Sequence, residues 1–250
     1  MEYSEQLPLF PELFMFSQFS PSKLKVLQKC PLQYYLKYIV KYTPEITPTN
    51  DTTARDAGKT LHSILELAVK GIELDKAVSA SKEINEIDEA FWEANVAPHL
   101  ENVETFLTKL EKFNNAHGIV KIQTELKVGV TRDWKKTTFF DPNVFMRGVI
   151  DLLLVATDRA FIIDHKKGGS SEWGLKNYMD QLNVYKPFTL ALYPDIEFVA
   201  AGIHFIEEGA VSLEPDFSPK EHIVKSIIPL IEYNVSEAEK AVRETGYFKH

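Results

Sequence analysis

Two acidic residues lie within stretches of sequence that are otherwise apolar. Asp151 falls inside VIDLLL (149–154), and Asp164 ends FIID (161–164), with Lys166 two residues further on. Side chains alternate between the faces of a strand, so we expect Asp164 and Lys166 to point the same way. Burying an unpaired carboxylate costs several kcal/mol, so each acid needs a cation, hydrogen bonds or a metal. Two acids and a lysine at one sheet edge suit a divalent cation and a group that orients an attacking water.

The same residues also allow a purely structural interpretation. Asp164 and Lys166 could form an ion pair at a strand end, and Asp151 could cap a neighbouring backbone group. In GKTLHSILE (58–66), Gly58, His62 and Glu66 are spaced four residues apart, so they share one face of a helix. Its neighbours are apolar, however, and a histidine in that position is more often a core residue than a ligand.

The elements that position these residues follow from periodicity and turn signals. Ser20 before Pro21 predicts a helix start, because the hydroxyl caps the helix and proline suits its first turn. Further helices are predicted from Pro31 to about Tyr42, over 53–70, in two pieces over 75–116 separated near Pro98, over 173–192 and over 219–245. Strands are predicted over 121–130, 145–156, 159–167, 196–206 and 210–213.

This order of elements predicts an α/β fold with a mixed sheet. We expect residues 1–19 to form an N-terminal arm and residues 20–250 a single domain, with 72–118 as a helical insertion before the first strand. A chain of 250 residues is long enough to bury a substantial core.

Composition excludes several classes of protein. The single cysteine, Cys30, excludes an internal disulfide and any four-cysteine zinc or iron–sulfur site within one chain. No run approaches the roughly 20 apolar residues of a membrane span, and residues 1–10 lack the basic residues of a secretory signal. We therefore expect an intracellular protein. The net charge of −8 argues against nonspecific coating of nucleic acid, but not against an enzyme that acts on it.

Five segments, in this order, carry a resemblance to a known family. They are SPSKLKVLQKCPLQYYLKY (20–38), GKTLH (58–62), RGVID (147–151), IIDHKKG (162–168) and QLNVY (181–185). Each is weak alone, but together the chain resembles the RecB-like nucleases of the PD-(D/E)XK superfamily over most of residues 20–206. The resemblance implies a restriction-endonuclease-like αβββαβ core with an N-terminal helical addition, which agrees with the elements predicted above.

The resemblance also implies a metal site. His62, Asp151, Asp164 and the backbone carbonyl of His165 would hold one or two Mg²⁺ or Mn²⁺ ions. The imidazole would make Mn²⁺ at least as favourable as Mg²⁺. Lys166 would position the hydrolytic water or stabilise charge that develops on the phosphate.

Further residues take supporting roles by the same resemblance. Gln181 and Tyr185 would lie on a helix beside the site and hold the DNA backbone or the lysine. Glu125, in the first strand, matches an acid often found there and would support Lys166 or the attacking water. Gln and Tyr at this spacing are common on helices and mean little by themselves.

The segment that opens the domain is rich in lysine and tyrosine. Lys23 could contact phosphates, and Tyr34, Tyr35 and Tyr38 could stack on exposed bases. The alternative is that the tyrosines form the inner face of the helices and the lysines their solvated face. Cys30 lies near the first cysteine of relatives that carry an iron–sulfur cluster, but no cysteine follows Tyr185, so we expect no cluster and a buried, apolar role for Cys30.

The sequence thus predicts a Mg²⁺- or Mn²⁺-dependent deoxyribonuclease, and we expect an exonuclease of DNA recombination, repair or phage DNA processing. DNA, single- or double-stranded, is the expected partner. With no phosphate-binding loop of a helicase in the chain, a separate helicase, a recombination protein or further copies of the chain could assist it. The cytoplasm of a bacterium or of a phage-infected cell would be its setting. One alternative is a catalytically silent DNA-binding or assembly module, and another is a hydrolase of a different phosphoester.

Overall fold

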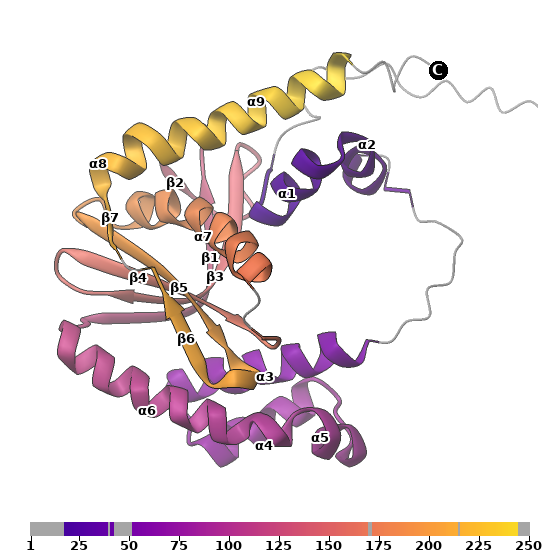
Figure 1. Ribbon diagram of the computed structural model, residues 1–250, viewed down its shortest axis with the longest axis vertical. Helices are drawn as coiled ribbons and strands as arrows, with labels where there is room; N and C mark the ends of the chain where they lie inside the picture. The colour runs from indigo at the N-terminus through magenta and orange to yellow at the C-terminus, as the bar shows by residue number, and fades with distance from the viewer. Residues whose placement is uncertain (1–17, 40, 43–51, 170–171, 215, 245–250) are drawn as a thin grey trace, which may run out of the picture.

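The computed structural model describes residues 18–39, 41–42, 52–169, 172–214 and 216–244. Of the predicted N-terminal arm, only Gln18 and Phe19 fall within these ranges. A seven-stranded mixed sheet runs through the described part of the chain, and helices cover both of its faces (Figure 1). The α/β class expected from the sequence is confirmed.

The sheet has the strand order β2-β1-β3-β4-β5-β6, and β7 pairs with β5. Every neighbouring pair is antiparallel except β4 and β5, whose parallel pairing requires the long crossover through the helix α7. The strands are β1 (Lys121–Val130), β2 (Lys136–Thr137), β3 (Met146–Val155), β4 (Arg159–Lys166), β5 (Phe198–Phe205), β6 (Ala210–Leu213) and β7 (Ser218–Pro219).

The first helix begins where its capping residue predicts a start. The Ser20 hydroxyl accepts a hydrogen bond from the Lys23 N–H at 3.2 Å, which caps α1. The helices are α1 (Pro21–Lys29), α2 (Pro31–Tyr34), the π-helix η1 (Tyr35–Ile39), α3 (Thr53–Val69), α4 (Leu74–Ile84), α5 (Glu89–Asn95), the 3₁₀ turn η2 (Ala97–His99), α6 (Leu100–His117), α7 (Glu172–Leu192), the 3₁₀ turn η3 (Ile206–Glu208), α8 (Lys220–His222), the π-helix η4 (Ile223–Ile227) and α9 (Ile228–Glu244).

Two helical boundaries differ from the prediction. The second helix ends as a π-helix at Ile39, and Lys41 and Tyr42 are not helical. The stretch 75–116 holds three α-helices and a 3₁₀ turn, because Asp88 caps an additional helix before Pro98. None of the helices in the described ranges combines the length and apolarity that a membrane span requires.

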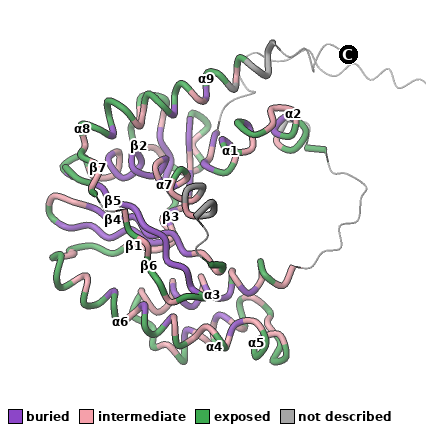
Figure 2. Tube along the Cα trace, in the orientation of Figure 1, coloured by how far each residue is buried: buried purple, intermediate pink, exposed green. Residues whose placement is uncertain are grey.

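Each face of the sheet has its own hydrophobic core. The α7-side core includes Leu27, Phe188 and Ile231 and lies under α1, α7 and α9. The α3-side core includes Leu61 and Phe106 and lies under α3 to α6. The central strands are buried along most of their length, as Figure 2 shows. Charged side chains on these strands therefore lie in a poorly solvated environment.

Side-chain alternation along β3 reverses at one position. Ile150 packs in the α7-side core and Leu152 in the α3-side core, although residues two apart on a regular strand share a face. Asp151 lies between them. In the pairing of β1 with β3, Thr124 pairs with Leu152 and Leu126 with Ile150, whereas Glu125 and Asp151, which lie opposite each other, are not paired. Glu125 has φ = 46°, a backbone conformation that non-glycine residues rarely adopt. The irregularity places two carboxylates where the strands change faces.

Candidate active site

Four elements bring the candidate ligands to the place where the strands reverse. α3 supplies His62, β1 supplies Glu125 and β3 supplies Asp151. Their ligand atoms all lie within 4.8 Å of one another, which makes a cluster suited to a metal ion. β4 runs beside β3 and supplies Asp164 and Lys166.

Backbone groups of β4 fix the orientation of two of these ligands. The N–H of His165 donates to Asp151 Oδ2 at 2.9 Å, and the carbonyl of His165 accepts from His62 Nε2 at 2.9 Å. A carbonyl can only accept, so this contact assigns the proton to Nε2 of His62. In the neutral ring, Nδ1 then presents a lone pair toward Asp151 Oδ2, 3.6 Å away. Two acceptors that face each other at this distance suit a cation between them.

Asp164 and Lys166 form an ion pair at the buried end of β4. Lys166 Nζ lies 2.6 Å from Asp164 Oδ2, and Asp164 is only 6% exposed. Burial, together with the nearby Asp151 carboxylate, raises the pKa of Asp164 to about 6 despite the lysine. Beyond the ion pair, this buried oxygen finds no hydrogen-bond donor among the residues that the structure describes.

Glu125 is the second acid whose ionisation is disfavoured. Burial raises its pKa to about 7, with repulsion from Asp151 and Glu66 adding to the shift. Three carboxylates, Glu125, Asp151 and Asp164, therefore converge on a region to which Lys166 brings the opposing charge. The excess of negative charge and the mixed oxygen and nitrogen donors fit Mg²⁺ or Mn²⁺.

An open depression leads to the cluster from the side of α3. It has a volume of about 420 Å³ and is lined by Gly58, His62, Glu66 and Glu125, among others. Glu66 lies one turn after His62 on α3 and pairs with Lys70 at 2.5 Å. The sequence showed that Glu66 shares a helical face with His62, but gave it no role. Its proximity to Glu125 depends on how α3 packs against β1.

Gln181 and Tyr185 lie on α7 beside this site. Tyr185 is buried, and desolvation together with the Asp164 and Asp151 carboxylates raises the pKa of its hydroxyl far above the usual range. The Gln181 amide is hydrogen-bonded to that hydroxyl. The Tyr185 ring covers Gly148 so closely that a Cβ there would lie 2.5 Å from Cε1. Gly148 thus allows α7 to approach β3 near Asp151.

The structure favours the inner-face interpretation for part of the lysine- and tyrosine-rich segment. Tyr34 is 2% exposed and stacks on Phe19, and Tyr35 is 8% exposed. Neither ring is available for stacking on bases in this structure, because both are buried. Tyr38 is half-buried, with the ammonium groups of Lys23 and Lys37 each 5.3 Å from the centre of its ring.

Cys30 differs from the expected apolar role. It is half-buried and caps α2, with its sulfur accepting a hydrogen bond from the Gln33 N–H at 3.4 Å. As the single cysteine of the chain, it cannot hold an iron–sulfur cluster of the four-cysteine kind.

Comparison with known proteins identifies the class that this fold and site define. The family model of the PD-(D/E)XK nuclease superfamily matches residues 18–243. The chain therefore belongs to the PD-(D/E)XK nuclease superfamily, whose members are generally nucleases that use divalent metal ions.

The other comparisons add little to this assignment. A search of the curated proteins finds no match. Among solved structures, the crystal structure of SSO0001 is similar over 85% of both chains, at 14% sequence identity and a TM-score of 0.30. A similarity at this level carries no argument about function.

Proposed function

We propose that the protein is a RecB-like, Mg²⁺- or Mn²⁺-dependent deoxyribonuclease that acts as an exonuclease. The observation that carries the proposal is the convergence of His62, Glu125 and Asp151 beside the Asp164–Lys166 pair. These residues come from α3, β1, β3 and β4, and a structural ion pair alone would not require the other three. We take residues 20–250 as one nuclease domain, with 72–118 as its helical insertion.

Each residue has a role that its surroundings support. His62, Asp151, Asp164 and the carbonyl of His165 would hold the metal, with Glu125 close enough to join them. When bound, the metal supplies Lewis acidity toward the phosphate and lowers the pKa of a coordinated water. Lys166 is placed to orient the attacking water or to stabilise charge on the phosphate oxygens.

Glu125 is the group best suited to take a proton near neutral pH. Its pKa of about 7 in the metal-free protein lies where a general base is most effective. Asp151, by contrast, accepts a backbone hydrogen bond from His165 and would serve as a metal ligand.

The wider context follows from the same proposal. Its substrate would be DNA, single- or double-stranded, during recombination, repair or phage DNA processing, in the cytoplasm of a bacterium or of a phage-infected cell. A separate helicase, a recombination protein or further copies of the chain would supply any unwinding or processivity.

A degradation assay tests the proposal. Linear and circular DNA, single- and double-stranded and labelled at either end, is incubated with Mn²⁺ or Mg²⁺ and with either the wild type or Lys166→Ala. We expect metal-dependent loss of linear DNA only, abolished in the variant, and the end label released first would give the polarity.

Two other outcomes of this assay would change the assignment. Cleavage of circular DNA would make the protein an endonuclease. Tight DNA binding without cleavage in either metal would favour the silent binding module, and turnover of a small phosphoester without any effect on DNA would favour a different hydrolase.

A further inference from the structure

A second polar pocket lies beside the metal cluster, at an open edge of β3. It has a volume of about 340 Å³ and lies between the start of α1, β3 and α7. The polar side chains that line it are Ser20, Ser22, Lys23, Arg147, Gln181 and Tyr185.

The pocket exists because β3 is only partly paired on this side. β4 pairs with β3 from Leu152 onward. At the other end, Phe19 bridges to the strand, with its N–H donating to the Phe145 carbonyl and its carbonyl accepting from the Arg147 N–H, both at 2.8 Å. The chain then turns into α1, so the backbone of β3 after Arg147 lines the pocket instead of a neighbouring strand.

Two cations line this pocket without an acidic partner. Lys23 Nζ donates to the Gln18 carbonyl at 3.1 Å, and Arg147 Nη1 donates to the Phe139 carbonyl at 3.2 Å. Neither forms an ion pair with a carboxylate in the part of the chain that the structure describes. Burial and the neighbouring Arg147 charge lower the pKa of Lys23, so the ammonium is held where its charge is disfavoured.

Hydroxyl groups complete a set of donors suited to an anion. The hydroxyls of Ser20 and Ser22 lie 3.1 Å apart at the mouth of the same pocket. A guanidinium, an ammonium and hydroxyls together match the oxygens of a phosphate. Arg147 of β3 and Lys23 in the first turn of α1 supply the positive charge of the pocket, and Ser20 and Ser22 add their hydroxyls.

The pocket lies on the same strand as the candidate active site. Arg147 precedes Asp151 by four residues of β3, which corresponds to about 13 Å along the strand. Gln181 lines the pocket and is also hydrogen-bonded to the Tyr185 hydroxyl. The charges of Asp151 and Asp164 raise the pKa of that hydroxyl, so Tyr185 lies near the acidic cluster. A phosphate in the pocket would therefore lie a few nucleotides from a phosphodiester bond at the metal cluster.

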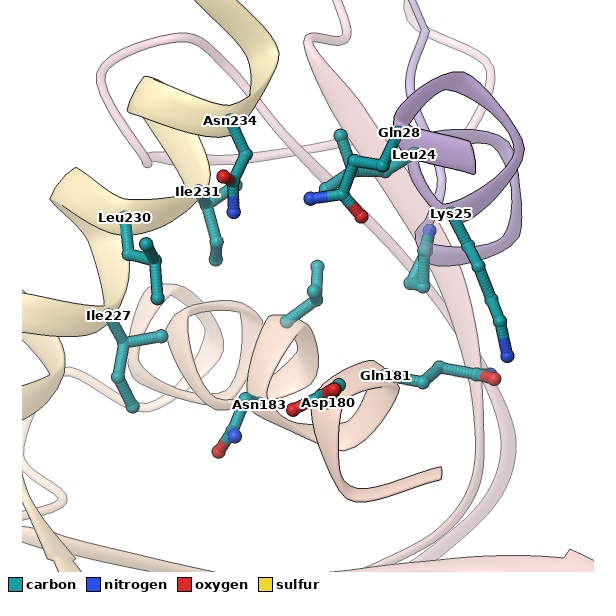
Figure 3. A pocket seen from close by; sticks show the side chains of 12 residues that line it. Leu24, Lys25, Gln28, Asp180, Gln181, Asn183, Ile227, Leu230, Ile231 and Asn234 are labelled. Atoms are coloured by element: carbon teal, nitrogen blue, oxygen red, sulfur yellow. The ribbon is translucent and has the colours of Figure 1, made fainter. Parts of the chain in front are cut away.

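The neighbouring pocket shows a different chemistry. It lies between α1, α7 and α9 and has a volume of about 380 Å³. It shares Pro21 and Gln181 with the pocket that Lys23 and Arg147 line. Figure 3 shows apolar side chains such as Leu24 and Ile231 within it, with Lys25 and Gln181 at one rim. It is also lined by Asp180, so its positive charge is opposed by a carboxylate, unlike that of the pocket that Lys23 and Arg147 line.

We propose that the pocket formed by Ser20, Ser22, Lys23 and Arg147 binds a backbone phosphate of the DNA strand, a few nucleotides from the bond to be cut. The proposal rests on the proposed nuclease function and adds to it a residue, Arg147, and a position on the substrate. The bound phosphodiester, with its single negative charge, accepts hydrogen bonds from both cations and holds the strand in register with the metal cluster.

Binding in the absence of metal tests this pocket without requiring cleavage. A short fluorescein-labelled single-stranded oligonucleotide is titrated with protein in EDTA, and anisotropy gives Kd as a function of salt. We expect Arg147→Ala and Lys23→Gln each to raise Kd about tenfold. Each should also reduce the slope of log K against log salt by about 0.7, the value for one single-strand phosphate contact. Lys29→Ala, which removes an exposed charge from the end of the same helix, serves as the matched control and should change Kd about twofold or less.

The position of the phosphate is tested by a second scan. Single neutral methylphosphonate linkages are placed one at a time along the oligonucleotide. We expect one linkage to weaken binding to the wild type, and the same linkage to have no further effect on Arg147→Ala. Arg147→Lys, which keeps the charge without the guanidinium fork, should recover part of the affinity and serves as the variant if Arg147→Ala does not fold.

Several results would overturn the proposal. One is an affinity of Arg147→Ala and Arg147→Lys equal to that of the wild type, and another is a scan in which every linkage weakens binding equally. A flat scan together with competition by inorganic phosphate that depends on Arg147 would mean that the pocket takes free phosphate instead. A wild type that shows the expected scan but never cuts DNA would overturn the nuclease proposal and leave the pocket standing.

Discussion

Two regions of opposite charge lie a few residues apart on β3. Around Asp151, three carboxylates converge against one lysine, whereas around Arg147 two cations face no carboxylate in the described ranges. In each region the charges of the side chains are unbalanced. The comparison indicates that the first region suits a metal cation and the second an anion, which are the two components that a metal-dependent nuclease must bring together.

The two regions are also built differently. The acidic region depends on backbone groups of β4 and on an irregular strand pair, which hold Asp151 and Glu125 in place. The cationic region depends on α1 meeting the open edge of β3 after the bridge at Phe19. A left-handed backbone conformation occurs in both regions, at Glu125 (φ = 46°) in the first and at Gln18 (φ = 70°), whose carbonyl accepts from Lys23, in the second.

The largest effect should come from neutralising the acidic region. Asp164→Asn keeps the shape of the side chain but removes a charge beside the metal cluster, and we expect DNA cleavage to fall by about three orders of magnitude. Single-turnover cleavage in Mn²⁺ measures this. Asp195→Asn, which alters an exposed carboxylate away from the cluster, is the control, and wild-type cleavage by Asp164→Asn would contradict the assignment.

The close approach of α7 to β3 between the two regions depends on Gly148. A Cβ there would lie 2.5 Å from Tyr185 Cε1 and 3.2 Å from Phe188 Cε2, so α7 would have to move. We expect Gly148→Ala to lower the free energy of unfolding by about 2 kcal/mol, as overpacking generally does. Urea denaturation measures this change. At Gly168 a Cβ would have no atom within 4 Å, so Gly168→Ala should be nearly neutral, and equal effects for the two variants would refute the explanation.

If His62 ligates the metal as proposed, its imidazole nitrogen should set the preference of the acidic region among metals. His62→Ala should weaken Mn²⁺ binding about tenfold and Mg²⁺ binding less, because imidazole suits Mn²⁺ better. Isothermal titration calorimetry with each metal measures the difference. His222→Ala removes an exposed histidine and should leave both affinities unchanged, whereas equal losses for both metals in His62→Ala would argue against direct ligation.

The smallest effect concerns the pH dependence of the metal-free protein. The pKa of Glu125 is raised from 4.5 to about 7, so its protonated form is favoured in the folded state. Its contribution to stability is therefore complete below about pH 4.5 and is lost as the pH rises through 7. In EDTA, the Tm of the wild type should fall by a few °C more than that of Glu125→Gln between pH 5 and pH 8.

The control for this measurement is a second glutamate. Glu101→Gln changes an exposed side chain and should leave the wild-type pH dependence intact. If Glu125→Gln and the wild type gave parallel curves of Tm against pH, burial of Glu125 would not be the source of the effect.

Much of the fold could be predicted from local patterns. The bounds of β1 and β6 coincide with the predicted ranges, since β-branched runs between turn residues specify strands locally. Ser20 and Pro21 marked the start of α1, because a capping hydroxyl and a proline in the first turn also act locally. The two-residue strands β2 and β7 were not predicted, because such short pairings depend on the neighbouring strand rather than on their own residues.

The candidate site was likewise predictable in part from the sequence and in part only from the tertiary structure. The residues alone singled out Asp151, Asp164 and Lys166, because charged side chains in apolar strands stand out, whereas the ligand role of His62 came from the family resemblance. Only the tertiary structure brought Glu125 opposite Asp151 and placed Arg147 near Lys23, and it buried the rings of Tyr34 and Tyr35. Residue type and periodicity are local properties of a chain, whereas burial, strand reversal and the distance between charges arise only when distant segments pack together.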